Sequence, residues 1–277
     1  MAYDYRKIDV TVDRGIATAT ISNPPINVMT VDLMQELIAL SLEIEADDDV
    51  RVMVMKSADP DFFIAHFDVA AILDRPTDSQ AIPSHKPKLY HEMCERWRLI
   101  PKVTIAQIEG RIGGGGSEMA ASMDMRFGVR GKTFVNQMEV ALGILPGGTG
   151  TQRLPRMMGR ARALEVILGC DDLDAETAEA WGYLNRAMEA EEISAFVERL
   201  AMRIASFPAP AVALAKQSVN ASVKPLAEGL ADEAHLFDIL LRTPEAKANM
   251  ARFMEIGGQT REGELRMGDL CAELGQS

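Results

Sequence analysis

The chain has 277 residues, of which 47% are hydrophobic and 25% charged, and these proportions are typical of a folded globular protein rather than a disordered one. Its formal net charge of −12 disfavours nucleic acid and anionic membrane surfaces as partners, because both select for basic patches. No stretch approaches the roughly 20 consecutive apolar residues that a transmembrane helix needs.

The cysteines and the first residues indicate a cellular setting. The three cysteines, Cys94, Cys170 and Cys271, are widely spaced and contain no Cys-x-x-Cys pair. Residues 1–7 alternate polar and apolar side chains, unlike the apolar block of a signal peptide. We therefore expect a reduced cytoplasmic protein without an ordered metal site.

The first predicted elements are a hairpin and a helix. Residues 8–13 and 16–21 alternate as strands do, with a turn across Asp13-Arg14-Gly15 between them. Residues 32–45 carry apolar side chains at helical spacing, and Thr30 is a suitable N-cap.

Strand and helix signals continue to alternate up to about residue 190. Residues 50–55 and 103–108 are predicted strands, and residues 89–98 form an amphipathic helix. Between them, residues 74–88 contain three prolines and many polar residues, which predicts a loop. This alternation predicts an α/β fold. From Glu189 onward only helices are predicted, over residues 193–207, 209–223, 226–241 and 244–256.

A glycine-rich segment carries the strongest functional signal. Gly113–Gly116 follow the apolar strand 103–108 and lead into a helix-like stretch that begins Ser117-Glu118. A glycine turn that enters a helix presents unpaired N–H groups and the positive end of the helix dipole. Such a turn suits an anion or an oxygen that becomes anionic during a reaction. With Glu118 beside it and Glu139 in the next element, the pattern favours acyl chemistry with acid–base catalysis.

Glycine runs also occur in nucleotide-binding motifs and in structural turns. A phosphate-binding Walker loop requires Gly-Lys-Ser/Thr, but Gly116 is followed by Ser117-Glu118. The dinucleotide-binding fingerprint lacks its acidic residue at the expected distance. A run of glycines that only allows a helix to pack closely on a sheet remains open.

The order and spacing of motifs along the chain resemble the crotonase superfamily, the enoyl-CoA hydratase/isomerase group. The resemblance extends from about residue 8 to about residue 253 and is most specific over residues 113–154, which include Leu142-Gly143, Pro146-Gly147-Gly148 and Thr151-Gln152-Arg153. It implies a spiral of ββα units followed by a C-terminal α-helical trimerisation region. The corresponding division is a core with the acyl-CoA site in residues 1–192 and an oligomerisation region in residues 193–277.

The resemblance also implies roles for individual residues. The backbone N–H groups of Gly115 and Phe67 match the two donors that hold the thioester oxygen in this family. Glu118 and Glu139 match the two carboxylates that position water over the enoyl double bond in its hydratases. The substrate-binding positions implied by the family are Ala65, His66, Asp68, Gly114, Pro146, Gly147 and Phe253.

The turn Ala65-His66-Phe67-Asp68 departs from the family's Ala-Gly-Ala-Asp, and the added side chains should restrict the acyl group. A backbone donor survives any replacement except proline, so the oxyanion hole can persist. Phe253 is expected near the CoA site of an adjoining subunit.

The prediction is an enoyl-CoA hydratase that adds water to a trans-2-enoyl-CoA to give the 3-hydroxyacyl-CoA. His66 and His91 are weaker candidates for a base, because neither has a Ser or Cys in a nucleophile motif nearby. No cofactor is expected, since CoA enters as part of the substrate. The expected assembly is a homotrimer or a dimer of trimers. The alternatives are a Δ3-Δ2 enoyl-CoA isomerase that uses Glu139 alone and a non-catalytic acyl-CoA binder.

Overall fold

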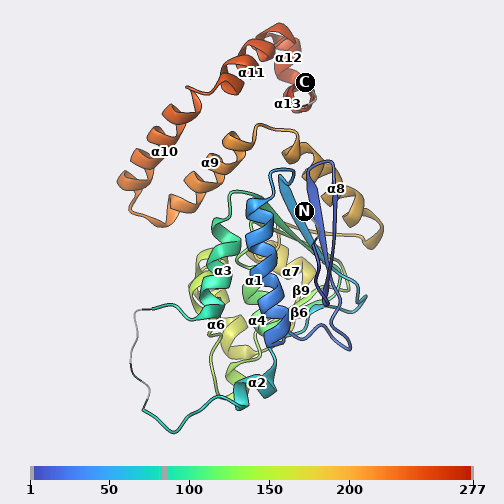
Figure 1. Ribbon diagram of the computed structural model, residues 1–277, viewed down its shortest axis with the longest axis vertical. Helices are drawn as coiled ribbons and strands as arrows, with labels where there is room; N and C mark the ends of the chain where they lie inside the picture. The colour runs from blue at the N-terminus through green and yellow to red at the C-terminus, as the bar shows by residue number, and fades with distance from the viewer. Residues whose placement is uncertain (1–2, 81, 83–85, 276–277) are drawn as a thin grey trace.

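A six-stranded sheet forms the centre of the protein (Figure 1). The computed structural model describes residues 3–80, 82 and 86–275. The strands, in their order across this sheet, are β1 (Ile8–Asp13), β2 (Ile16–Ile21), β3 (Val52–Ser57), β5 (Val103–Ile108), β7 (Met125–Val129) and β10 (Arg186–Met188). β1 and β2 form the predicted antiparallel hairpin, and the remaining neighbours pair in parallel.

A second, smaller sheet runs beside the first. Its strands, in order, are β4 (Phe62–Ile64), β6 (Arg111–Gly113), β8 (Phe134–Asn136) and β9 (Leu173–Asp174). Successive pairs β3–β4, β5–β6 and β7–β8 each place one strand in either sheet before the chain continues into helices. This repetition is the spiral of ββα units that the family resemblance implied.

Helices cover both faces of the large sheet. The bounds of the helices in the first two thirds of the chain are α1 (Val31–Ala46), α2 (Val69–Leu73), α3 (Leu89–Leu99), α4 (Gly114–Ala120), the short 3-10 helix η1 (Val140–Leu142), α5 (Gly150–Met158), α6 (Arg160–Gly169), α7 (Ala175–Trp181) and α8 (Ala190–Ala205). β3 is buried on both faces: Val52 and Val54 pack with α8, whereas Met53 and Met55 pack with the core that includes α1 and α3.

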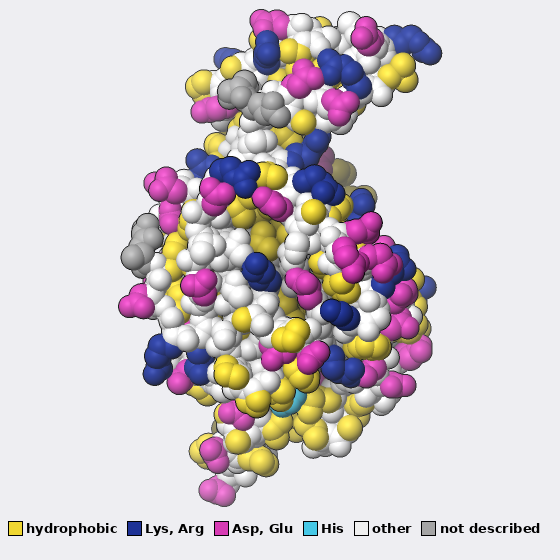
Figure 2. All heavy atoms as spheres, turned by 90° about the vertical axis from the view of Figure 1, so that its right-hand side faces the viewer, with side chains coloured by type: hydrophobic (Ala, Val, Ile, Leu, Met, Phe, Trp, Pro, Cys, Tyr) yellow, Lys and Arg dark blue, Asp and Glu magenta, His cyan; other side chains and the backbone are white. Residues whose placement is uncertain are grey.

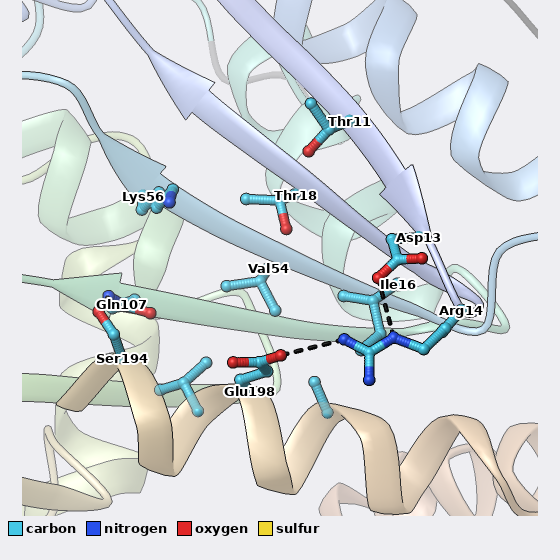
Figure 3. A pocket seen from close by; sticks show the side chains of 12 residues that line it. Thr11, Asp13, Arg14, Ile16, Thr18, Val54, Lys56, Gln107, Ser194 and Glu198 are labelled. Carbon is cyan, nitrogen blue, oxygen red and sulfur yellow. Dashed lines mark hydrogen bonds and ion pairs between the residues drawn. The ribbon is translucent and has the colours of Figure 1, made fainter. Parts of the chain in front are cut away.

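The groove between the hairpin and α8 lies along the seam where α8 packs on the large sheet. Figure 3 shows Arg14 in the β1–β2 turn between Asp13 and Glu198 of α8. Its guanidinium lies 2.8 Å from the Asp13 carboxylate and 3.1 Å from that of Glu198. Neither Glu118 nor Glu139 lines this groove.

The last third of the chain forms an arm that projects from the body (Figures 1 and 2). Its helices are α9 (Ala209–Asn220), the 3-10 helix η2 (Ala221–Val223), α10 (Leu226–Leu240), α11 (Pro244–Glu255), α12 (Arg261–Leu265) and α13 (Met267–Leu274). Figure 2 shows hydrophobic side chains among the charged ones on this arm, and exposed examples are Leu226, Leu230, Phe237 and Met254. Among the described residues, no helix is both long and apolar enough to cross a membrane.

Most of the predicted elements are present, with small shifts. The predicted Thr30 cap is confirmed, since its side chain accepts a hydrogen bond from Leu33 N. The strand predicted at residues 50–55 lies two residues later, and α8 begins three residues earlier than predicted. Residues 81 and 83–85 of the predicted loop lie outside the described residues, and the described residues from 75 to 88 form no helix or strand.

A buried ion pair anchors the arm to the body. Lys216 of α9 lies 2.8 Å from the Asp124 carboxylate, and its side chain is only 9% exposed. Asp124 Oδ2 also accepts hydrogen bonds from the amide and hydroxyl of Thr104, at 2.8 and 3.1 Å. Burial lowers the pKa of Lys216 and raises that of Asp124, and each group opposes the shift of the other.

Lys216→Met should therefore lower the free energy of unfolding by about 3–5 kcal/mol, because it leaves a buried carboxylate without its cation. Urea denaturation followed by circular dichroism at neutral pH measures the change. Lys224→Met is the matched control, because Lys224 pairs with Asp232 on the exposed surface and should have no measurable effect. Equal stability of the two variants would contradict the anchoring role.

Candidate active site

The glycine run forms the first turn of α4 instead of preceding it. α4 begins at Gly114 and is buried along its whole length, with extended Gly113 as its N-cap. A Cβ atom on Gly116 would lie 2.6 Å from the Ile64 carbonyl oxygen, so a side chain there would push α4 away from β4. The glycines therefore place the helix N-terminus directly against the small sheet.

Glu118 projects from α4 and is held by a second glycine turn. Only 3% of the residue is exposed. Its Oε1 atom accepts hydrogen bonds from the backbone N–H groups of Gly148, Thr149 and Gly150, at 2.8, 2.8 and 2.7 Å. Burial raises the pKa of Glu118, and these three donors oppose the rise because they stabilise the ionised form. The Oε1 atom of Glu118 is thus fixed by this turn, whereas its Oε2 atom accepts none of these three hydrogen bonds.

Glu139 follows β8 and is the N-cap of η1. It is 8% exposed, and its Oε2 atom has no hydrogen-bond partner among the described residues. Burial, with a smaller contribution from the negative charge of Glu118, raises the pKa of Glu139 to about 7. A carboxyl group with a pKa near neutrality can give or take a proton at physiological pH. A Cβ atom on Gly114 would lie 3.0 Å from Glu139 Oε1, which places the carboxyl against the glycine turn.

The N–H groups of Phe67 and Gly115 border the same space. Phe67 lies in a bridge with Met29, where the Met29 amide donates to His66 O and the Asp68 amide donates to Met29 O, at 2.8 and 3.0 Å. These bonds leave the Phe67 N–H without an acceptor among the described residues. The Gly115 N–H, in the first turn of α4, likewise has no acceptor among them. A Cβ atom on Gly115 would lie 3.5 Å from Phe67 N. The pair can donate together to one oxygen.

The other predicted substrate-binding residues line hollows near this centre, cap a helix or lie on the arm. Ala65 and His66 line a hollow of about 210 Å³, together with Ile26 and Met138; we call it the His66 hollow. Asp68 caps α2, because its side chain accepts a hydrogen bond from Ala70 N at 2.9 Å.

Pro146 and Gly147 line a larger hollow of about 760 Å³ on the side of Glu118. Phe253 lies in α11 on the arm, where its ring covers Gly258, so a single chain does not bring it to the two glutamates (Figure 1).

Two residues of the centre were absent from the sequence prediction. Tyr90 of α3 donates a hydrogen bond from its hydroxyl to Gly115 O at 2.5 Å, and its ring lies edge-on to Phe67 with centroids 5.7 Å apart. Gln137 is fully buried, and its Nε2 atom lies 3.4 Å from Gly114 O. The available signals were the position of Tyr90 on an amphipathic helix and that of Gln137 two residues before Glu139.

Comparisons with known proteins agree with this fold. The family model for enoyl-CoA hydratase/isomerase matches residues 11–261. The chain is 31% identical over 243 residues to the short-chain-enoyl-CoA hydratase of Clostridium acetobutylicum, covering 87% of this chain and 91% of that protein. It is also 26% identical over 212 residues to the 1,2-epoxyphenylacetyl-CoA isomerase of Escherichia coli, with 76% and 80% covered.

Solved structures show the same fold. A protein from Streptomyces avermitilis is 34% identical with a TM-score of 0.71, and the match covers 99% of this chain and all of that one. An enoyl-CoA hydratase from Geobacillus kaustophilus is 27% identical with a TM-score of 0.84, covering 93% of this chain and 96% of that one. The match of the family model over nearly the whole length, together with the crotonase fold, shows that the chain belongs to the enoyl-CoA hydratase/isomerase family.

Proposed function

We propose that the protein is an enoyl-CoA hydratase that adds water to a trans-2-enoyl-CoA and forms the 3-hydroxyacyl-CoA. The observation that carries the proposal is that two buried carboxyl groups, Glu118 of α4 and Glu139, lie at the glycine turn whose Gly115 N–H, like that of Phe67, has no acceptor among the described residues. Hydratases among the relatives, such as the enzyme of Clostridium acetobutylicum, support the same reaction class.

The mechanism uses each part of the centre once. The N–H groups of Phe67 and Gly115 donate to the thioester oxygen and stabilise the enolate that develops on it. Glu118 takes a proton from water while the water oxygen bonds to the β-carbon. Glu139 in its protonated form gives a proton to the α-carbon. CoA arrives as part of the substrate, and this sequence of steps needs no metal or redox cofactor.

The environments of the two carboxyl groups favour this division of roles. Three N–H donors favour the ionised form of Glu118, as a base requires, despite the opposing effect of burial. The pKa of Glu139 near 7 keeps a large protonated fraction at neutral pH, as an acid requires.

Glu118→Gln and Glu139→Gln should each lower kcat for crotonyl-CoA hydration by about 10²–10⁴ and leave KM nearly unchanged, because they remove proton transfer and keep the shape of the side chain. Loss of the enoyl-thioester absorbance measures the rate. Full hydratase activity in either variant would contradict the two-glutamate mechanism. Isomerisation of a 3-enoyl-CoA that survives in Glu118→Gln but not in Glu139→Gln would identify an isomerase that uses Glu139 alone.

The pH dependence tests the assignment of Glu139. Its raised pKa means that the carboxyl is mostly protonated below about pH 7 and mostly ionised above it. If it donates the proton to the α-carbon, kcat/KM for hydration should fall as pH rises through about 7. Steady-state rates between pH 5 and 9 give the profile. The residual activity of Glu139→Gln should lack this transition, and an unchanged transition in that variant would assign it to another group.

We also propose that residues 193–277 serve assembly and that the protein is a cytoplasmic homotrimer or dimer of trimers. The projecting arm with its exposed hydrophobic side chains supports this, because a monomer would leave that surface in water (Figure 2).

Light scattering at micromolar concentration should give the mass of three or six chains, and a monomeric mass would contradict the proposal. Phe237→Glu, which places a charge on a side chain that is 61% exposed in the single chain, should shift the mass towards the monomer. Arg242→Glu is the control: it too adds negative charge to the arm, but at a side chain that is already charged and 73% exposed.

A further inference from the structure

The larger hollow beside Glu118 carries an excess of positive charge. Its lining includes three arginines, Arg98, Arg153 and Arg156, and one carboxylate, Glu95; we call it the arginine hollow. Glu95 is shared, since Arg98 donates to its Oε2 atom at 2.7 Å and Arg153 pairs with its Oε1 atom. A local excess of arginine is unusual in a chain of net charge −12, and it attracts an anion.

Among these three arginines, Arg156 is the one without a carboxylate partner in the described structure. Its guanidinium donates to the backbone carbonyl of Gln152, and it forms no ion pair with any described carboxylate. The same wall presents hydrogen-bonding groups from Thr151, Asn220 and Ser222. A planar guanidinium with neighbouring polar groups is well suited to a carboxylate.

The position of the arginine hollow relative to Glu118 and Glu139 assigns it to the acyl end of the substrate. This assignment rests on the proposed function. Along a 2-enoyl thioester the order of atoms is sulfur, carbonyl, α-carbon and β-carbon. Glu139 serves the α-carbon and Glu118 the β-carbon, so the acyl chain continues beyond Glu118. The arginine hollow lies there, since Gly147 and Thr149 of its wall belong to the turn that holds Glu118. The His66 hollow lies on the opposite side, next to Glu139.

We propose that the arginine hollow selects an acyl group that ends in a carboxylate, so that the preferred substrates are mono-CoA thioesters of 2-unsaturated dicarboxylic acids. An alkyl end of equal length would displace water from the arginines and provide no acceptor for them. Sites built around polar groups discriminate strongly against ligands that leave those groups unpaired. The apolar side chains of Pro146, Val219 and Val223 line the same hollow and suit the methylene part of such a chain.

Two substrates of equal chain length test the proposal: trans-2-hexenoyl-CoA and the mono-CoA thioester of trans-2-hexenedioic acid. The kcat/KM for hydration should be at least about tenfold higher for the carboxylate-ended substrate, the advantage of one charge-assisted hydrogen bond. Equal values or a preference for the methyl-ended substrate would overturn the proposal while leaving the hydratase intact. Absence of hydration with both would instead refute the proposed function.

Substitutions test which side chain is responsible for the preference for a carboxylate-ended substrate. Arg156→Gln should reduce the ratio of the two kcat/KM values by about tenfold. The ratio does not depend on the fraction of folded enzyme, because both substrates are measured on the same sample. Arg160→Gln is the matched control, because Arg160 is also exposed, lies in the neighbouring helix α6 and does not line the hollow. Its ratio should equal that of the unmodified protein.

The same measurements exclude the other source of anionic groups, the phosphates of CoA. If the arginine hollow held a phosphate, Arg156→Gln would lower kcat/KM equally for both substrates and leave the ratio unchanged. That outcome would overturn the proposal.

Discussion

The candidate active site depends on the three backbone N–H groups that converge on Glu118 Oε1. They join α4, which carries the glutamate, to the turn that opens α5, two segments separated by 30 residues in the chain. The turn also provides one wall of the arginine hollow, and Gly148 packs against the ring of Tyr90. The same few peptide groups therefore set the direction of the Glu118 carboxyl group and part of the shape of the arginine hollow.

Glycine is required where these segments meet. A Cβ atom on Gly148 would collide with Glu118 and Tyr90, and one on Gly150 would lie 2.8 Å from Pro146. On the other side of the centre, a Cβ atom on Gly115 would lie 3.0 Å from both Phe67 Cβ and the Tyr90 hydroxyl oxygen. The close approach of the backbone leaves both carboxyl groups buried. That burial raises the pKa of each, and more backbone N–H donors oppose the rise at Glu118 than at Glu139.

The sequence predicted the elements that depend on short-range residue patterns, and the family resemblance implied the overall fold. The hairpin of β1 and β2 and the cap at Thr30 follow from short-range patterns, and both are confirmed. Strands of two or three residues, such as β4 and β9, are too short to give a periodic signal. α4 begins inside the glycine run because tertiary packing overrides the poor helix propensity of glycine. Tyr90 and Gln137 reach the glycine turn only through contacts between distant segments, which no single-sequence pattern records.

Glu118 also acts as the anion at the N-terminus of α5, whose first residue is Gly150. A negative charge in this place is stabilised by the positive end of α5, and that stabilisation is weakened when the carboxylate accepts a proton. In the proposed cycle, hydration leaves Glu118 protonated and Glu139 ionised, so Glu118 must release its proton to solvent and Glu139 must regain one before the next turnover. The positive end of α5 thereby helps to restore the ionised base after each hydration, whereas dehydration, which must begin with Glu118 protonated, has to overcome the same stabilisation of the carboxylate.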